Sequence, residues 1–152
     1  MKILVTGGAG FIGSHLCDAL INRGDTVTVV DNLLLGREEN IRHLYDSDKF
    51  TFINADVLDS IMMKRVFKTG DFEMVFHLAA NSDIQKGGKD PEVDYNLTFN
   101  TTFRILQLMS DYGIKKLFFA STSAIYGETN DLLHENYGPL RPVSNYGAGK
   151  LA

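Results

Sequence analysis

The sequence predicts an α/β protein built around a parallel β-sheet, and two observations support this. Short runs rich in β-branched and aromatic residues alternate with longer stretches that have the period of an α-helix. The short runs are apolar along their length, as expected of parallel strands that helices cover on both faces. A chain of 152 residues with 44% hydrophobic content is long enough for one such domain.

Five strands are expected, over residues 2–6, 26–30, 50–53, 74–78 and 116–121. A first helix is expected from Phe11 to about Gly24. A long helix is expected from Pro91 to Tyr112, where Gly113 would end it. Residues 32–40 and 81–89 are expected to be looser segments, and loops at strand ends are where α/β sheets bind ligands.

Composition excludes some partners. The net charge of -4 provides no basic field for phosphate backbones, so neither nucleic acid nor an anionic membrane surface is an expected partner. Cys17 is the single cysteine, so no intramolecular disulfide can form, and this is typical of a reduced, cytoplasmic protein. The apolar run at the N-terminus is too short for a signal sequence or a membrane span, so a soluble protein is expected.

A glycine-rich segment, Thr6-Gly7-Gly8-Ala9-Gly10-Phe11-Ile12-Gly13, lies between the first expected strand and the first expected helix. In this position Gly7 permits a tight turn, Gly10 lets the backbone approach a pyrophosphate, and Gly13 lets the helix pack close to the strand. The amides at the start of the helix would face the phosphates. The segment therefore predicts a Rossmann-type doubly wound sheet that binds a dinucleotide.

An acidic residue follows the second strand. Asp31 lies about 20 residues beyond the glycines, where a carboxylate reaches the ribose hydroxyls of an adenosine and repels a 2′-phosphate. NAD is therefore expected rather than NADP, although Arg37 could soften this preference. Without the upstream glycines, Asp31 would read equally well as a helix cap or turn residue, and Asp56 taken alone is better read as a turn residue.

Three further motifs join the glycines: His77-Leu78-Ala79-Ala80, Ser121-Thr122-Ser123-Ala124-Ile125-Tyr126-Gly127, and Tyr146-Gly147-Ala148-Gly149-Lys150. With all four motifs in this order at the expected strand ends, the sequence resembles the extended short-chain dehydrogenase/reductase family along its whole length. Within the family it is most similar to the nucleotide-sugar 4-epimerases that act on UDP-glucose and UDP-galactose.

The resemblance implies a set of cofactor contacts. Phe11 and Ile12 would lie along the pyrophosphate, residues 31–36 would surround the ribose, and residues 78–82 would run under the nicotinamide side. Asn96 resembles the family's helix asparagine that braces the active-site backbone, although Phe99-Asn100 stands where relatives have Gly-Thr. The full expected NAD site comprises Gly7, Gly10, Phe11, Ile12, Gly13, Asp31, Asn32, Gly36, Asp56, Val57, Leu78, Ala79, Ala80, Asn96, Tyr146 and Lys150.

The resemblance also implies the catalytic residues. Tyr146 would be the base, with Lys150 four residues later on the same helix face and Thr122 beside the reacting oxygen. A tyrosine titrates near 10, so bringing its pKa to about 7 requires roughly 4 kcal/mol of phenolate stabilisation, which a nearby ammonium and a positive nicotinamide would supply. Ser123 is a weaker candidate for the role of Thr122, and Tyr126 is expected to be structural.

The residues after Thr122 narrow the reaction. Related 4,6-dehydratases have an Asp-Glu pair there and related decarboxylases keep the glutamate, whereas this sequence has Ser123-Ala124. An NAD-dependent nucleotide-sugar 4-epimerase is therefore expected. The alternatives are a reductase or dehydrogenase of the same family, or a catalytically silent dinucleotide-binding module.

The chain is expected to be a truncated NAD-binding domain, residues 1–152, that lacks a C-terminal substrate domain. The helix that carries Tyr146 and Lys150 would be cut near its start, so both residues are expected to be poorly ordered and the isolated chain inactive. The expected partner is a nucleotide sugar; a homodimer through the long helix rests on analogy. No metal site is expected.

Overall fold

A computed structural model gives the structure of the chain and describes all 152 residues except the side chain of Ile84. The chain divides into two compact units. The first unit contains Met1–Ala79 and Thr101–Phe119, and the second unit contains Ala80–Asn100 and Ala120–Ala152. None of the described helices is long and apolar enough to cross a membrane.

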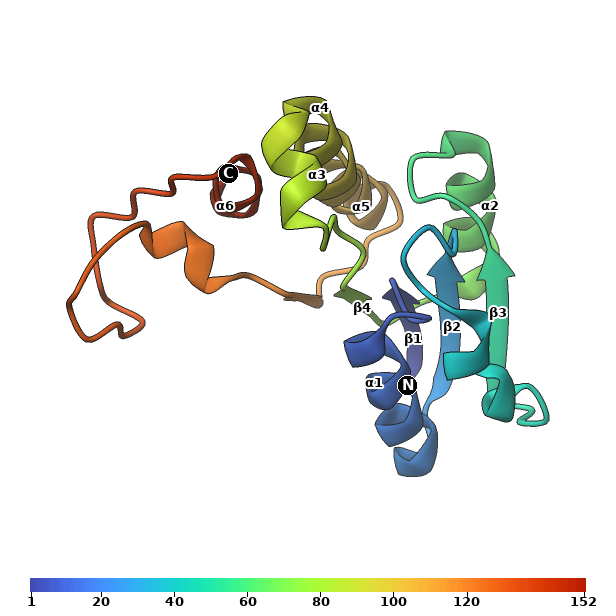
Figure 1. Cartoon of the computed structure of the whole chain (residues 1–152). Helices are drawn as coiled ribbons and strands as arrows, with labels where there is room; N and C mark the ends of the chain where they lie inside the picture. Colours follow the sequence, from blue (N-terminus) through green and yellow to red (C-terminus); the bar gives the residue numbers. More distant parts are fainter. The chain divides into compact units, whose positions relative to one another are not determined.

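A parallel sheet of five strands forms the centre of the first unit, in the order β3-β2-β1-β4-β5 (Figure 1). The strands are β1 (Lys2–Thr6), β2 (Thr26–Asp31), β3 (Phe50–Asn54), β4 (Met74–His77) and β5 (Leu117–Phe119). The chain moves outward from β1 to β3 and then crosses back to β4, so the strand order reverses between β1 and β4. This confirms the predicted Rossmann-type doubly wound sheet, in which the reversal point is the usual place for a ligand.

The first unit has helices on both faces of its sheet. These are α1 (Phe11–Arg23), α2 (Ser60–Gly70) and α5 (Thr101–Asp111), with short 3-10 turns η1 (Glu38–Asn40) and η2 (Arg42–Leu44). Successive side chains of a strand point to opposite faces. Accordingly Ile3 and Val5 pack in the core cluster that includes Cys17 and Leu20 of α1, whereas Leu4 packs in the cluster that contains residues of α2 and α5.

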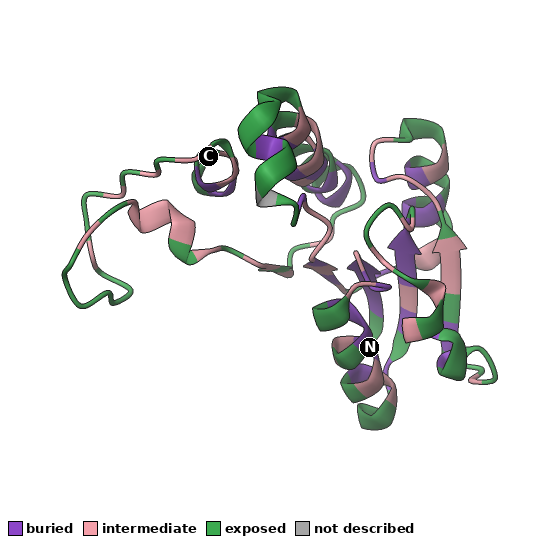
Figure 2. Cartoon of the chain, in the orientation of Figure 1, coloured by how far each residue is buried: buried purple, intermediate pink, exposed green. Residues whose placement is uncertain are grey.

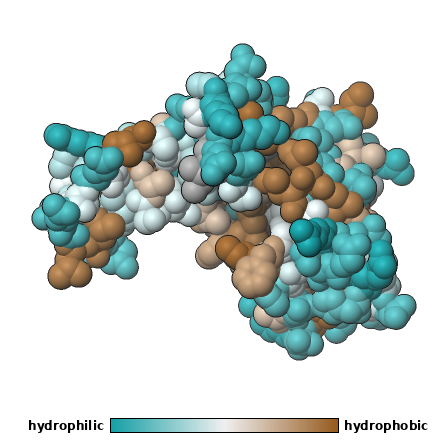
Figure 3. All heavy atoms as spheres, viewed as in Figure 1, coloured by the Kyte–Doolittle hydropathy of each residue, from teal (hydrophilic) through white to brown (hydrophobic). Residues whose placement is uncertain are grey.

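Burial follows the position of each strand in the sheet. The central strands β1 and β2 are buried along most of their length, whereas the edge strand β3 is largely half-buried or exposed (Figure 2). Apolar side chains also reach the surface, where Figure 3 shows them as brown spheres among hydrophilic ones. Phe11 and Ile12, in the first turn of α1, are 78% and 69% exposed.

Helices without strands make up the second unit. They are α3 (Ile84–Lys89), α4 (Pro91–Asp94), the π-helix η3 (Tyr95–Asn100), the 3-10 helix η4 (Ser123–Tyr126) and α6 (Asn145–Leu151). α6 packs against η3, η4, α3 and α4. Polar side chains cap the short helices: Asp83 accepts from the Lys86 amide, Asp90 from the Glu92 amide, and Ser144 from the Gly147 amide.

Two predictions about helices need correction. The expected long helix from Pro91 to Tyr112 is divided into α4, η3 and α5, because a π-helical segment interrupts the α-helical hydrogen bonding. Residues 81–89 were expected to be loose, but Ile84–Lys89 form α3, whose first turn Asp83 caps. α2 was not among the expected helices, although its N-cap Asp59 and its buried residues Met63, Val66 and Phe67 mark it in the sequence.

Two glycines of the first unit offer a matched test of backbone crowding. Gly7 and Gly113 both have positive φ, +74° and +71°, so alanine is strained at either position. A Cβ on Gly113 would meet nothing within 4 Å, whereas a Cβ on Gly7 would lie 2.6 Å from the backbone nitrogen of Ala79. Gly113→Ala should cost about 1 kcal/mol of unfolding free energy and Gly7→Ala at least about 2 kcal/mol more, measured by urea unfolding. Equal costs would contradict the crowding at Gly7.

Candidate functional site

The glycine turn after β1 is built as the sequence predicts. Gly10 is the N-cap of α1 and makes no side-chain cap hydrogen bond. A Cβ on Gly13 would lie 2.3 Å from the Gly7 carbonyl oxygen, and a Cβ on Gly8 would lie 2.6 Å from the side chain of Val29. The turn can therefore exist only with these small residues, and it leads into the N-terminus of α1, a position that can bind a phosphate. Gly8 was not among the predicted site residues.

Asp31 organises the turn after β2 and also reaches the glycine turn. One of its carboxylate oxygens accepts from the amide of Ala9 at 3.0 Å, and the other accepts from the amide of Leu33 at 2.9 Å. Leu33 has a φ of 59°, in the left-handed region. A Cβ on Gly36 would lie 3.0 Å from both carboxylate oxygens, so glycine there leaves space beside the acid. Asp31 thus also stabilises the turn that follows β2, and its role toward a ribose remains a prediction.

A hydrogen bond between two predicted site residues joins the segments that follow β2 and β3. The Asn32 side chain donates to Asp56 at 2.9 Å, and the other oxygen of Asp56 accepts from the Leu58 amide at 2.7 Å. Asp56 is half-buried, whereas Val57 is buried in the core cluster that contains α2 residues. Asp56 could therefore offer a carboxylate to an adenine, while Val57 could offer its backbone.

The segment after β4 lies close to the glycine turn. The Leu78 amide donates to the Thr6 carbonyl at 3.0 Å, and Ala79 is the residue against which a side chain at position 7 would collide. Buried His77 is hydrogen-bonded to the hydroxyls of Thr6 at 2.6 Å and Thr102 at 3.1 Å. His77 thus ties β4 to β1 and α5, a role that its place in the motif did not reveal. Ala80 begins the second unit.

All three predicted catalytic residues lie in the second unit. Thr122 precedes η4, and its hydroxyl accepts from the Ala124 amide at 3.2 Å. The Lys150 ammonium lies 6.0 Å from the centre of the Tyr146 ring. The expectation that Tyr146 and Lys150 would be poorly ordered is wrong, because the Ser144 cap and the packing of α6 on η3 and η4 hold this short helix.

Burial governs the titration of both α6 residues. The pKa of Tyr146 is raised above 10.0, first by burial and further by the negative charge of Asp94, while the hydrogen bond from Thr122 acts in the opposite direction. Burial lowers the pKa of Lys150 from 10.5 to about 8. In the chain by itself, Tyr146 is therefore a neutral phenol at neutral pH, and the phenolate stabilisation that the sequence predicts is not provided by these side chains alone.

The helical region after Pro91 contacts the segment after β4 through residues other than those that the sequence suggested. Asn96 is half-buried, and Thr98 is one of the residues that contact this segment. Thr98 is completely buried, its hydroxyl accepts from the Asn81 amide at 3.3 Å, and its methyl group would lie 3.5 Å from a Cβ on Gly149 of α6. The role assigned to Asn96 thus remains a prediction, and Thr98 is the residue of η3 that binds the Asn81 amide.

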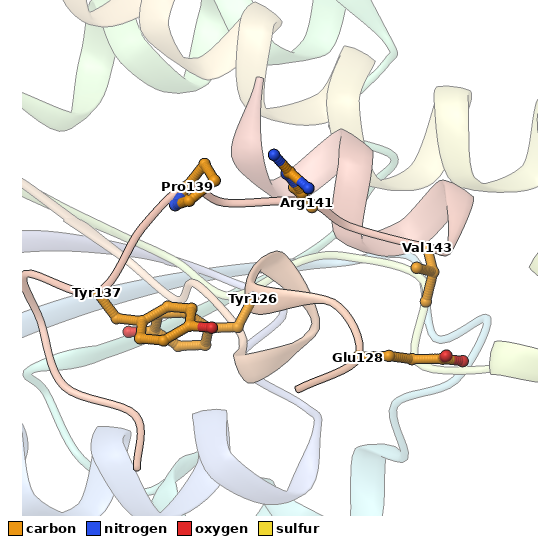
Figure 4. A pocket seen from close by; sticks show the side chains of 6 residues that line it. All are labelled: Tyr126, Glu128, Tyr137, Pro139, Arg141 and Val143. Atoms are coloured by element: carbon orange, nitrogen blue, oxygen red, sulfur yellow. The ribbon is translucent and has the colours of Figure 1, made fainter. Parts of the chain in front are cut away.

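A separate hollow of about 350 Å³ lies in the second unit, between η4 and the segment that precedes α6 (Figure 4). It is lined by Tyr126, Glu128, Tyr137, Pro139, Arg141 and Val143. Tyr126, which was expected to be structural, packs edge-on against Tyr137 at 5.7 Å between ring centres, and its hydroxyl donates to the His134 carbonyl at 3.4 Å. None of the predicted catalytic residues lines this hollow.

A parallel sheet with a glycine turn after its first strand and an acid after its second defines a Rossmann-type protein. The family model described as GDP-mannose 4,6 dehydratase matches residues 4–152. The chain therefore belongs to this family, within the extended short-chain dehydrogenases/reductases that its motifs resemble.

Individual relatives agree with this assignment. The UDP-glucose 4-epimerase of Halalkalibacterium halodurans is 37% identical over 152 residues, which cover 100% of this chain and 44% of that protein. The structure of Thermotoga maritima UDP-glucose 4-epimerase with UDP-glucose matches with a TM-score of 0.91 and 39% identity, covering 99% of this chain and 48% of the other. The UDP-glucose 4-epimerase of Thermus thermophilus, in complex with NAD, matches with a TM-score of 0.89 and 38% identity, covering 99% and 47%. The chain spans about half the length of the curated relatives it matches.

The buried lysine predicts a pH-dependent stability. Lys150 has a pKa of about 8 in the folded chain and 10.5 when exposed, so between these values the unfolded state binds more protons and the free energy of unfolding rises with pH. Below pH 8 the cost of burying the charge is fully present. Lys150→Met should therefore stabilise the chain more at pH 7 than at pH 10, measured by urea unfolding.

The control for this comparison is Lys89→Met, which removes an exposed lysine from the same unit. Burial raises the pKa of Cys17 to about 12, and this thiol has the opposite effect on the pH dependence, but it is present in every variant and cancels. If Lys150→Met changed the free energy of unfolding equally at both pH values, burial of the Lys150 ammonium would carry no free-energy cost.

Proposed function

We propose that this chain is the NAD-binding part of a nucleotide-sugar 4-epimerase that acts on UDP-glucose or UDP-galactose. The observation that carries the proposal is the cluster in the second unit, in which Tyr146 lies one helical turn before the buried Lys150 and their helix α6 packs against η4, which Thr122 caps. The relatives named UDP-glucose 4-epimerase support the substrate class. We also propose that the sugar nucleotide is held largely by sequence beyond these 152 residues, because the relatives are about twice as long.

The residues of the first unit fit a dinucleotide. The uncapped amides after Gly10 suit a pyrophosphate, and the space beside Asp31 and Gly36 suits a ribose. Asp56 would accept from the exocyclic amine of adenine. When bound, NAD would accept a hydride from the sugar carbon and later return it to the opposite face. The relative from Thermus thermophilus was solved with NAD, which supports this choice of cofactor.

The chain's own side chains would handle the proton. Tyr146 would take the proton of the sugar hydroxyl, and Thr122, which acts to lower the pKa of Tyr146, would hold the reacting oxygen and shorten the proton path. Lys150, buried beside the Tyr146 ring, would place a positive charge close to the developing phenolate whenever it is protonated.

The residues that follow Thr122 favour epimerisation over elimination. Ser123 and Ala124 begin η4, and the Ala124 amide donates to the Thr122 hydroxyl. Because serine and alanine carry no carboxyl group, neither position provides a carboxylic acid. Removal of water or of a carboxyl group would need such acid–base groups, whereas moving a hydride away and back needs none beyond Tyr146.

An oxidoreductase of the same family with exchangeable cofactor is the second candidate, because the same Thr122, Tyr146 and Lys150 cluster would serve it. A silent dinucleotide-binding module is a third, since the chain spans about half of its relatives. Full-length protein that interconverts UDP-glucose and UDP-galactose without net change in NADH absorbance would support the epimerase. A stoichiometric NADH change would establish the oxidoreductase, and the absence of both reactions would leave the binding module.

The role of Tyr146 predicts a large loss on removing its hydroxyl. In the full-length protein, Tyr146→Phe should lower kcat by about 100-fold or more, because the proton acceptor is lost while the ring remains. Tyr126→Phe is the matched control, since that hydroxyl donates to the His134 carbonyl, and it should leave kcat within about twofold. Equal losses of kcat in the two variants would contradict the assignment of Tyr146 as the base.

Cofactor choice provides a test that needs no turnover. NAD should bind more tightly than NADP, because the Asp31 carboxylate accepts from ribose hydroxyls and repels a 2′-phosphate. Asp31→Asn should weaken NAD by about tenfold and affect NADP less, measured by calorimetry. Asparagine is preferable to alanine, since its side-chain oxygen can still accept from one of the two amides, Ala9 and Leu33, that bind this side chain.

Asp48→Asn, which removes an exposed carboxylate of the same unit, is the control for charge alone. Equal affinity of the unmodified chain for the two cofactors would contradict the assignment of Asp31.

A further inference from the structure

A buried carboxylate in the second unit has no part in the function proposed so far. Asp94, the last residue of α4, is 3% exposed. Among the described residues no salt bridge involves it, and the group that donates to it is neutral: the side-chain amide of Asn81, at 2.8 Å. Burying an ionised carboxylate without a cation is costly, so its position needs an explanation.

Asn81 is locked in place by the same cluster. It is 2% exposed, and its side-chain amide donates to both Asp94 and the Asp83 carbonyl, the latter at 2.9 Å. Its side-chain oxygen accepts from the Asp83 amide at 2.9 Å, and its own amide donates to the Thr98 hydroxyl at 3.3 Å. Asn81 therefore fixes the segment after β4 to both α4 and η3.

The cluster continues to the helix that carries Tyr146. The backbone of Gly87 in α3 lies directly against Asp94, because a Cβ on Gly87 would be 2.2 Å from a carboxylate oxygen. The Gly87 carbonyl accepts from the side chain of Asn145 at 3.3 Å. Asn145 directly precedes Tyr146 on α6. Hydrogen bonds and close packing thus connect Asp94 to the start of α6.

The negative charge of Asp94 acts electrostatically on the phenol of Tyr146. After burial, it is the second cause that raises the pKa of Tyr146. α4 packs against α3, η3 and α6. Apart from Asp94 itself, the charged or titratable side chains on these four elements are exposed except for Tyr146 and Lys150 of α6. The exposed ones are Lys86, Lys89, Glu92 and Tyr95. Asp83 and Asp90, which cap α3 and α4, are also exposed.

We propose that Asp94 is a positioning residue of the Tyr146 site: its buried carboxylate fixes the segment after β4 through Asn81, and it packs against Gly87, whose carbonyl binds the start of α6. Its negative charge also acts on the phenol of that helix. The proposal rests on the proposed role of Tyr146 as the base. The negative charge of Asp94 and the hydrogen bond from Thr122 then act in opposite directions on the proton affinity of the same phenol. Tyr146 stays neutral until further positive charge is brought to it, which would couple its activation to ligand binding.

The test is the ionisation of Tyr146 itself. The chain is labelled with 13Cζ-tyrosine, the Tyr146 signal is assigned from its loss in Tyr146→Phe, and its titration is followed by NMR, with circular dichroism confirming the fold at each pH. Asp94→Asn keeps the side-chain volume and can still accept from Asn81, and it should lower the pKa of Tyr146 by about one unit. Glu92→Gln, which removes an exposed charge from the same helix, should leave it unchanged.

Asn81→Ala tests the positioning role of Asp94 separately from the effect of its charge, because the Asp94 carboxylate stays in place. Amide hydrogen exchange at residues 81–83 should speed up at least tenfold, while the pKa of Tyr146 stays above its ordinary value. Should Asp94→Asn fail to fold, Asp94→Ser removes the same charge with a smaller side chain.

The proposal is overturned if the Tyr146 titration is the same with and without the Asp94 charge, if Glu92→Gln shifts it equally, or if exchange at residues 81–83 is unaffected by Asn81→Ala. Absence of epimerase activity in the full-length protein would instead remove the proposed function, and it would not alter these titrations.

Discussion

The close approach of two backbones at the carboxyl edge of the sheet is the constraint on which the first unit depends. The Gly7 amide donates to the Val30 carbonyl at the end of β2 at 2.9 Å, and its α-carbon lies against Ala79 just beyond β4. A parallel sheet brings these strand ends together, and the reversal of strand order leaves the crevice there. A side chain at position 7 would push the segments apart, and Asp31 would then lose its contact with the Ala9 amide. The cradle, the acid and the segment after β4 therefore depend on one another.

Local signals account for what could be predicted from the sequence. β1 begins and ends at the predicted residues, and α1 ends at Gly24, which adopts the left-handed conformation expected of a helix C-cap. The other strands differ by one to three residues at their ends; β5, predicted over residues 116–121, covers only Leu117–Phe119. The glycines and Asp31 were recognisable because they lie close together in the sequence, where one turn, one helix and one strand determine their spacing. Tyr146 and Thr122, far apart in the sequence, needed the family resemblance.

The remainder depends on tertiary contacts that the pattern does not encode. Across a π-helix the hydrogen bonds run from i to i+5, so the α-helical period no longer tells which residues share a face. Thr98, inside η3, is consequently the buried residue, although Asn96 carried the resemblance. His77 reads as an ordinary strand residue until the hydroxyls of Thr6 and Thr102 are seen on its two nitrogens. Nothing in the sequence distinguishes buried Asp94 from the exposed acids near it.

The second unit shows how burial alone biases an acid–base pair toward neutrality. Removing Tyr146 from water raises its pKa, and removing Lys150 from water lowers its pKa to about 8, so both shifts favour the uncharged forms. Of the described contributions to the phenol, the Thr122 hydrogen bond is the one that favours the phenolate, and the charge of Asp94 opposes it. A neutral hydrogen bond is weak compared with the roughly 4 kcal/mol that a base working near pH 7 requires. Under the proposed function, the missing stabilisation has to arrive with the ligands, which would keep Tyr146 from acting before they are in place.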